Sequence, residues 1–147
     1  MSGFEMSEWI ACPPKRVFKF ITDSNNAAKI VPSVKSSVKL TEGPPQVGTR
    51  YRETRLMGGK EQHAELEVKE YAEPDVYAMQ NVTDGIETVY RYKLRPEGDG
   101  TRIDLVCQVK AAGIKKLMLP LVASILKKED GAHLQRLKQV LEEQTTA

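Results

Sequence analysis

Two pairs of residues in this sequence have side chains suited to a functional site. Tyr90 and Tyr92 are two positions apart, so in a strand both phenol rings project from the same face. Glu53 and Arg55 have the same spacing, which places a carboxylate beside a guanidinium. Phenols donate hydrogen bonds and carboxylates accept protons, so these residues can hold the polar end of a ligand or act in acid–base catalysis. Their role depends on which face of each strand is buried.

Other motifs that carry chemistry are missing from the sequence. It has no glycine-rich phosphate loop, no nucleophile elbow and no His or Cys cluster with metal-ligand spacing. We therefore expect no metal and no cofactor, and we assign no catalytic residue. Three groups receive simple structural interpretations: solvated surface histidines (His63 and His133), small buried cysteines (Cys12 and Cys107) and a solvated charged helix face (Lys127, Lys128 and Asp130).

Length and composition indicate one globular domain over residues 1–147. Of the residues, 40% are hydrophobic and 29% are charged, and the net charge is only +2, so nucleic acid is not an expected partner. The longest apolar run, Leu117–Leu126, is shorter than the ~20 residues that span a bilayer, and a proline and a serine interrupt it. Acidic Glu5 and Glu8 argue against a secretory signal. We expect a cytoplasmic protein without stable membrane insertion.

Apolar periodicity predicts one strand, two short helices, six further strands and a long helix. The strands are predicted over Phe4–Ile10, Val34–Leu40, Arg50–Met57, Glu61–Tyr71, Val76–Val82, Glu87–Arg95 and Thr101–Lys110, and the short helices over Pro14–Thr22 and Asn25–Ile30. Gly58-Gly59 and Glu97-Gly98-Asp99-Gly100 are typical of hairpin turns, because glycine adopts positive φ at little cost. The long helix spans Ile114–Gln144, with Gly131-Ala132 indicating close packing or a kink.

Alternation along each strand assigns the side chains that face the core. The apolar faces of the last two strands carry Tyr90, Tyr92, Leu105 and Cys107. The apolar face of Glu61–Tyr71 carries Leu66 and leaves His63 outside. In the next strand, either Tyr77 and Met79 or Val76 and Ala78 face inward. The tyrosines can equally be core residues with satisfied hydroxyls.

The strand Arg50–Met57 has two possible phases. If Tyr51 faces inward, Glu53 and Arg55 also do so, in or at the mouth of an apolar pocket. Unpaired charges there would cost several kcal/mol, so the two would pair with each other or with a ligand. The other phase buries the alternate set, Arg52, Thr54 and Leu56, and a bulge can mix the two sets.

Four segments and the order of elements resemble the polyketide cyclase/dehydrase branch of the START and birch-allergen-like superfamily. The segments are Ile10–Phe18, Val47–Tyr51, Val68–Pro74 and Gly100–Ile103. The resemblance covers nearly the whole chain and implies an α+β helix-grip fold. In this fold a seven-stranded curved antiparallel sheet wraps around a long C-terminal helix, and two short helices follow the first strand. The resemblance also favours Tyr77 and Met79 as the pair that faces inward.

A pocket is expected where the concave sheet grips the helix, and the resemblance implies a small hydrophobic or aromatic ligand there. We predict that the pocket is lined by Tyr51, Glu53, Arg55, Leu66, Tyr77, Met79, Tyr90, Tyr92, Leu105, Cys107, Leu117 and Leu121. Leu117 to Leu121 can gate the entrance, although core packing is the simpler interpretation. Three functions remain open: binding of a lipid or polyketide-like molecule, an aromatase/cyclase or dehydratase reaction on a polyketide-like substrate, and a non-catalytic interaction module or homodimer.

Overall fold

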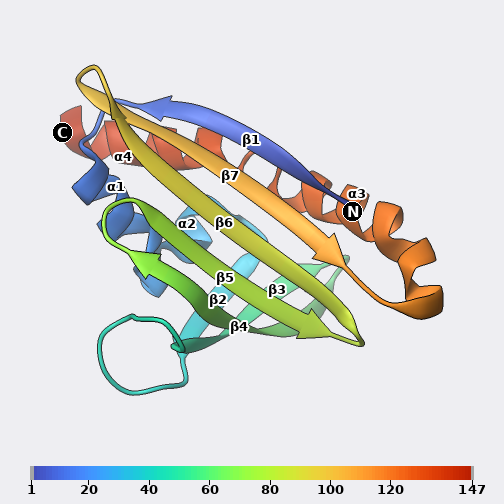
Figure 1. Ribbon diagram of the computed structural model, residues 1–147. Helices are drawn as coiled ribbons and strands as arrows, with labels where there is room; N and C mark the ends of the chain where they lie inside the picture. Colours follow the sequence, from blue (N-terminus) through green and yellow to red (C-terminus); the bar gives the residue numbers. More distant parts are fainter. Residues whose placement is uncertain (1, 147) are drawn as a thin grey trace.

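The strands form a meander to which the first strand is added at one edge (Figure 1). The computed structural model describes residues 2–146, and within them one seven-stranded antiparallel sheet has the order β1-β7-β6-β5-β4-β3-β2. The strands are β1 (Ser2–Ile10), β2 (Val34–Lys39), β3 (Arg50–Met57), β4 (Lys60–Ala72), β5 (Val76–Thr83), β6 (Ile86–Glu97) and β7 (Gly100–Lys110). Because each strand from β2 to β7 pairs antiparallel with the next one in sequence, these strands need no crossover connection.

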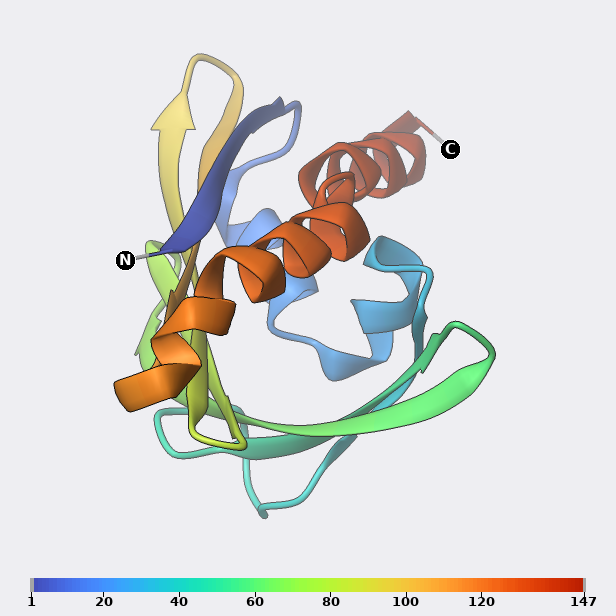
Figure 2. The ribbon, with the colours of Figure 1, turned by 90° about the vertical axis from the view of Figure 1, so that its right-hand side faces the viewer.

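The sheet curves around the helices, as Figure 2 shows. The helices are α1 (Pro14–Ile21), the 3₁₀ turn η1 (Ser24–Asn26), α2 (Ala27–Ile30), the 3₁₀ helix η2 (Gly113–Met118), α3 (Leu119–Asp130) and α4 (His133–Thr146). The second predicted short helix is therefore a 3₁₀ turn followed by a single α-helical turn. The predicted α+β helix-grip fold is confirmed.

The C-terminal helix is divided rather than continuous. The sequence predicted one helix over Ile114–Gln144, whereas the chain forms η2, α3 and α4. Pro120 lies in the first turn of α3, where its missing N–H costs nothing. Gly131 separates α3 from α4, and a Cβ at this position would lie 2.5 Å from the main-chain oxygen of Lys127. The break therefore occurs at the glycine where a kink or close packing was expected.

The main core lies between the sheet and helices α1 and α4. Its largest fully buried side chains include Ile10, Val17, Phe18, Val68, Ile103, Leu137 and Leu141. Phe18 of α1 makes edge contacts with two tyrosine rings, with centroids 5.2 Å from Tyr71 and 6.2 Å from Tyr77. Burying a side chain of this size stabilises the fold by about 1.5–3 kcal/mol. Cys12 and Cys107 are also buried.

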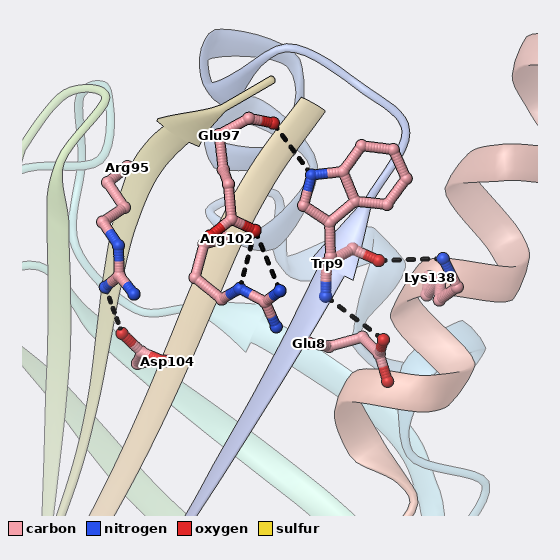
Figure 3. A network of polar contacts seen from close by, with 7 residues as sticks. All are labelled: Glu8, Trp9, Arg95, Glu97, Arg102, Asp104 and Lys138. Carbon is pink, nitrogen blue, oxygen red and sulfur yellow. Dashed lines mark hydrogen bonds and ion pairs between the residues drawn. The ribbon is translucent and has the colours of Figure 1, made fainter. Parts of the chain in front are cut away.

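Trp9 links β1 by hydrogen bonds to the end of β6 and to α4 (Figure 3). Its indole Nε1 donates to the main-chain oxygen of Glu97 at 2.9 Å. Lys138 Nζ donates to the main-chain oxygen of Trp9 at 2.8 Å and lies 5.3 Å from the centroid of the indole ring. A Cβ at Gly100 would lie 2.3 Å from the main-chain oxygen of Ile10 and 2.7 Å from the indole. This corner therefore closes only because residue 100 has no side chain.

Candidate ligand-binding site

A cavity of about 510 Å³ lies between the concave face of the sheet and the helices. The segment from α1 to α2 lines one side, β3 to β6 line the floor, and α3 crosses the remaining side. Much of its wall is apolar and includes Leu66, Met79, Ile86, Val122 and Leu126. The volume falls within the range of small-molecule pockets.

The structure settles the phase of β3. Tyr51 is buried and lines the cavity. Glu53 and Arg55 also line it, with side chains only 12% and 17% exposed, whereas Leu56 is exposed on the other face. The inward phase holds because the two charged groups are paired, which offsets much of the cost of removing them from water.

A polar cluster formed by Glu53, Arg55, Tyr90 and Asp130 occupies the cavity wall. Arg55 Nε donates to Glu53 Oε1 at 2.6 Å, and an Arg55 terminal nitrogen donates to Asp130 Oδ1 at 3.3 Å. The hydroxyl of Tyr90 donates to Asp130 Oδ2 at 3.0 Å. These hydrogen bonds join β3, β6 and the last residue of α3.

Asp130 is not on a solvated helix face, as its charge had suggested, because its side chain is only 1% exposed. The sequence did contain the signal. Asp130 precedes Leu134, Leu137 and Leu141 by 4, 7 and 11 residues, which places it on the buried helix face. Its carboxylate remains buried because Arg55 and Tyr90 supply donors to both oxygens.

His133 is also a cavity residue rather than a surface histidine. Its Nε2 lies 2.6 Å from the hydroxyl of Tyr92, and its Nδ1 is buried without a hydrogen-bond partner among the described residues. Burial, assisted by the positive charge of Arg55, lowers the pKa of His133 to about 4. Burial, assisted by the charge of Asp130, raises the pKa of Tyr92 well above its ordinary value. Near neutral pH both groups are therefore uncharged.

We predict that His133 makes the fold sensitive to acid. Its pKa in the folded state is about 4, against the ordinary 6.5, so between these values the unfolded chain binds more protons. This contribution to stability is complete above pH 6.5 and is lost as the pH falls through 4. Between pH 7 and 5 the loss is roughly 2 kcal/mol. In urea unfolding, the free energy of unfolding of His133→Gln should not show this loss between pH 7 and 5. The exposed control His63→Gln should show it. If His133→Gln loses as much stability as wild type between pH 7 and 5, His133 is not the source of the acid sensitivity.

Eight of the twelve residues predicted to line the pocket do line it. They are Tyr51, Glu53, Arg55, Leu66, Tyr77, Met79, Tyr90 and Tyr92. Tyr77 donates a hydrogen bond to Met79 Sδ at 3.3 Å, so this pair faces inward together. Ala78, from the alternative pair, is nevertheless buried as well.

The other four predicted lining residues lie elsewhere. Leu105 and Cys107 are fully buried in the core, but away from the cavity wall. Leu117 and Leu121 are 81% and 60% exposed, so they neither line the cavity nor pack in the core. The prediction assumed that the α-helical period runs through residue 117. It was wrong because Leu117 lies in η2, which has the three-residue period of a 3₁₀ helix. The buried stripe of α3 instead includes Leu119, Ala123 and Asp130.

Sequence reasoning also missed the helical wall of the cavity. This wall is formed by Ile21, Asp23, Ala27, Ile30, Val31, Val122 and Leu126. Apart from Asp23 these residues are visibly apolar, but periodicity alone does not distinguish a residue facing a cavity from one packed in the core. Within residues 2–146, no helix combines the length and apolar character needed to cross a bilayer.

A curved antiparallel sheet that encloses a cavity against C-terminal helices defines a helix-grip protein. The chain belongs to the family described as polyketide cyclase/dehydrase and lipid transport, whose model matches residues 1–142. Among curated proteins, no sequence matches it.

Solved structures share the fold at low sequence identity. Ara h 8.0201 has a TM-score of 0.74 and 19% identity, over 95% of this chain and 97% of its own. TTHA0849 from Thermus thermophilus has a TM-score of 0.72 and 19% identity, over 92% and 93%. The di-domain ARO/CYC protein StfQ from the steffimycin biosynthetic pathway has a TM-score of 0.77 and 12% identity, over 98% of this chain and 52% of its own. The present chain thus spans about half the length of StfQ.

Proposed function

We propose that this protein binds a small hydrophobic or aromatic molecule, such as a lipid or a polyketide-like compound, in the cavity of about 510 Å³. The observation that carries the proposal is an apolar cavity with a polar cluster in one part of its wall. Removing the apolar part of a ligand from water contributes roughly 25 cal/mol per Å². The polar cluster orients the ligand, as the few polar groups of small-molecule pockets do.

The tyrosines are suited to this role as neutral hydrogen-bonding groups. Burial, assisted by the charge of Asp130, raises the pKa of Tyr90 well above its ordinary value, so its hydroxyl stays protonated. Burial likewise raises the pKa of Tyr77, whose ring stacks on Tyr92 with centroids 6.2 Å apart. A flat aromatic ligand can pack against these rings in offset or edge-to-face arrangements.

Filling the cavity should abolish binding without unfolding the protein. Leu126 lines the cavity from α3, so Leu126→Trp places an indole in the ligand's space. We expect the affinity for the neutral fluorescent probe N-phenyl-1-naphthylamine to fall at least ~10-fold. The matched control is Ile125→Trp, which adds the same ring to an exposed position on the same helix. Equal affinities of the two variants would contradict the proposal, as would failure of wild type to bind any member of a broad lipid and polyphenol panel.

A second candidate function is an aromatase/cyclase or dehydratase reaction on a polyketide-like substrate. The burial of Glu53 in the same polar cluster as Tyr90 favours it. A carboxylate can accept a proton next to a carbonyl that a phenol polarises, once the Tyr90 hydroxyl donates to the substrate instead of to Asp130. Glu53→Gln and Tyr90→Phe should then abolish cyclisation of a linear polyketone while binding persists. Full turnover in both variants, or none in wild type, would remove the support for this function.

A further inference from the structure

The cavity wall is acidic although the chain as a whole is slightly basic. Four carboxylates line the cavity, those of Asp23, Glu53, Asp84 and Asp130, against the single guanidinium of Arg55. Among the described lining residues there is no lysine. The net charge of the whole chain is +2, so the excess of acid is a local property of this wall.

Arg55 does not leave a free positive charge for a ligand. One of its nitrogens donates to Glu53 and another to Asp130, so the polar cluster holds two carboxylates for one cation and has a net charge of −1. Two histidines also line the cavity. His133, which is hydrogen-bonded to Tyr92, is uncharged near neutral pH, and His63 is exposed and hydrogen-bonded to the hydroxyl of Thr54.

The two exposed carboxylates of the wall, those of Asp23 and Asp84, receive little compensation. Asp23 accepts from the main-chain N–H of Asn25, which carries no formal charge. Lys115 donates to the main-chain oxygen of Asp84, and it offsets part of the negative charge on that side of the cavity. The polar cluster and Asp23 therefore determine the sign of the field that a ligand meets.

We infer that the ligand carries its polar group as a neutral hydroxyl or a protonated amine, and that the cavity excludes hydrophobic carboxylates. This inference rests on the proposed ligand-binding function. A hydroxyl or an ammonium group donates to carboxylate oxygens, whereas a carboxylate adds a further uncompensated negative charge. For unit charges about 6 Å apart at an effective dielectric constant of about 20, the penalty is on the order of 100-fold in affinity.

Three isosteric ligands test the inference on the wild-type chain at pH 7.5. They are 1-naphthylmethanol, 1-naphthylmethylamine and 1-naphthoate, which share one ring system, are within one non-hydrogen atom of each other in size, and carry a neutral, a positive and a negative polar group. Displacement of N-phenyl-1-naphthylamine gives their relative affinities. We expect naphthoate to bind at least ~10-fold more weakly than each of the other two.

A charge variant extends the test. Glu53→Gln removes one negative charge from the cluster and should raise naphthoate affinity about 10-fold, while naphthylmethanol changes less than about 3-fold. The control Glu65→Gln makes the same change in net charge at an exposed position paired with Arg50, and it should change neither affinity. The wild-type comparison stands even if Glu53→Gln does not fold.

The outcomes separate this inference from the function on which it rests. If naphthoate binds wild type as tightly as either of the other ligands, the inference is wrong while the proposed binding function stands. If the probe and all three ligands fail to bind, the proposed function is wrong and the inference falls with it. If Glu65→Gln raises naphthoate affinity as much as Glu53→Gln, the selectivity comes from overall charge and the inference is also wrong.

Discussion

Replacing Arg55 with methionine should lower the free energy of unfolding by about 3–5 kcal/mol. The methionine fills much of the same space, but it leaves the carboxylates of Glu53 and Asp130 facing each other in the cavity wall with no cation between them. Removing one partner of a buried charge cluster is far more costly than removing the whole cluster, because an uncompensated charge stays away from water. Urea unfolding at pH 7 measures the loss.

Two comparisons separate this effect from the loss of a side chain. The triple variant Glu53→Gln/Arg55→Met/Asp130→Asn removes all three charges and should regain most of the lost stability. Arg50 lies on the same strand as Arg55 and makes an exposed ion pair with Glu65 of β4. Arg50→Met should therefore cost less than about 1 kcal/mol. A loss below about 1 kcal/mol for Arg55→Met would show that water reaches the cluster and screens its charges.

Gly100→Ala should cost about 3 kcal/mol, the upper part of the range for overpacked sites. The added methyl group would lie 2.3 Å from the main-chain oxygen of Ile10 and 2.7 Å from the ring of Trp9, and the main chain cannot rotate away as a side chain can. The start of β7 must then separate from β1, and the hydrogen bond from Trp9 to Glu97 must lengthen. Urea unfolding gives the loss, and a red shift of the Trp9 fluorescence reports the local change.

A neighbouring glycine provides the control. Gly98 has a φ of +58°, and outside the adjoining residues no atom lies within 4 Å of the position that a Cβ would take there. Gly98→Asn, which suits that backbone conformation, should therefore cost less than about 1 kcal/mol. If Gly100→Ala is as mild as Gly98→Asn, the close approach of β1 to β7 does not constrain residue 100.

The sequence predicted the strands well because two local signals agree. Alternation marked each strand, and glycines marked the turns, as at Gly58 and Gly59, whose φ values are +57° and +79°. The phase of β3 could not be predicted, because its two phases differ in whether Glu53 and Arg55 are buried. The answer depends on Asp130, which is 75 residues from Arg55 in sequence and contacts it only in the folded chain.

Asp130 and His133 show why candidate site residues were missed. Both occupy the inward side of the C-terminal helices, but their polar side chains were taken as evidence for solvent exposure. A polar residue can be buried only when a partner is present, and here the partners, Arg55, Tyr90 and Tyr92, come from strands distant in sequence. Periodicity in a single sequence predicts faces but does not identify such partners.

The break at Gly131 separates two tasks that a continuous helix would have to combine. α4 packs on β1 and α2 and carries Leu134, Leu137 and Leu141 into the main core. α3 packs on β1 and β7 through Leu119 and Ala123, crosses the cavity, and is tied to β3 and β6 through Asp130. α3 therefore turns Val122 and Leu126 toward the cavity, whereas the leucines of α4 fill the main core. Substitutions at Val122 and Leu126 can therefore change the volume open to a ligand while the side chains of the main core stay the same.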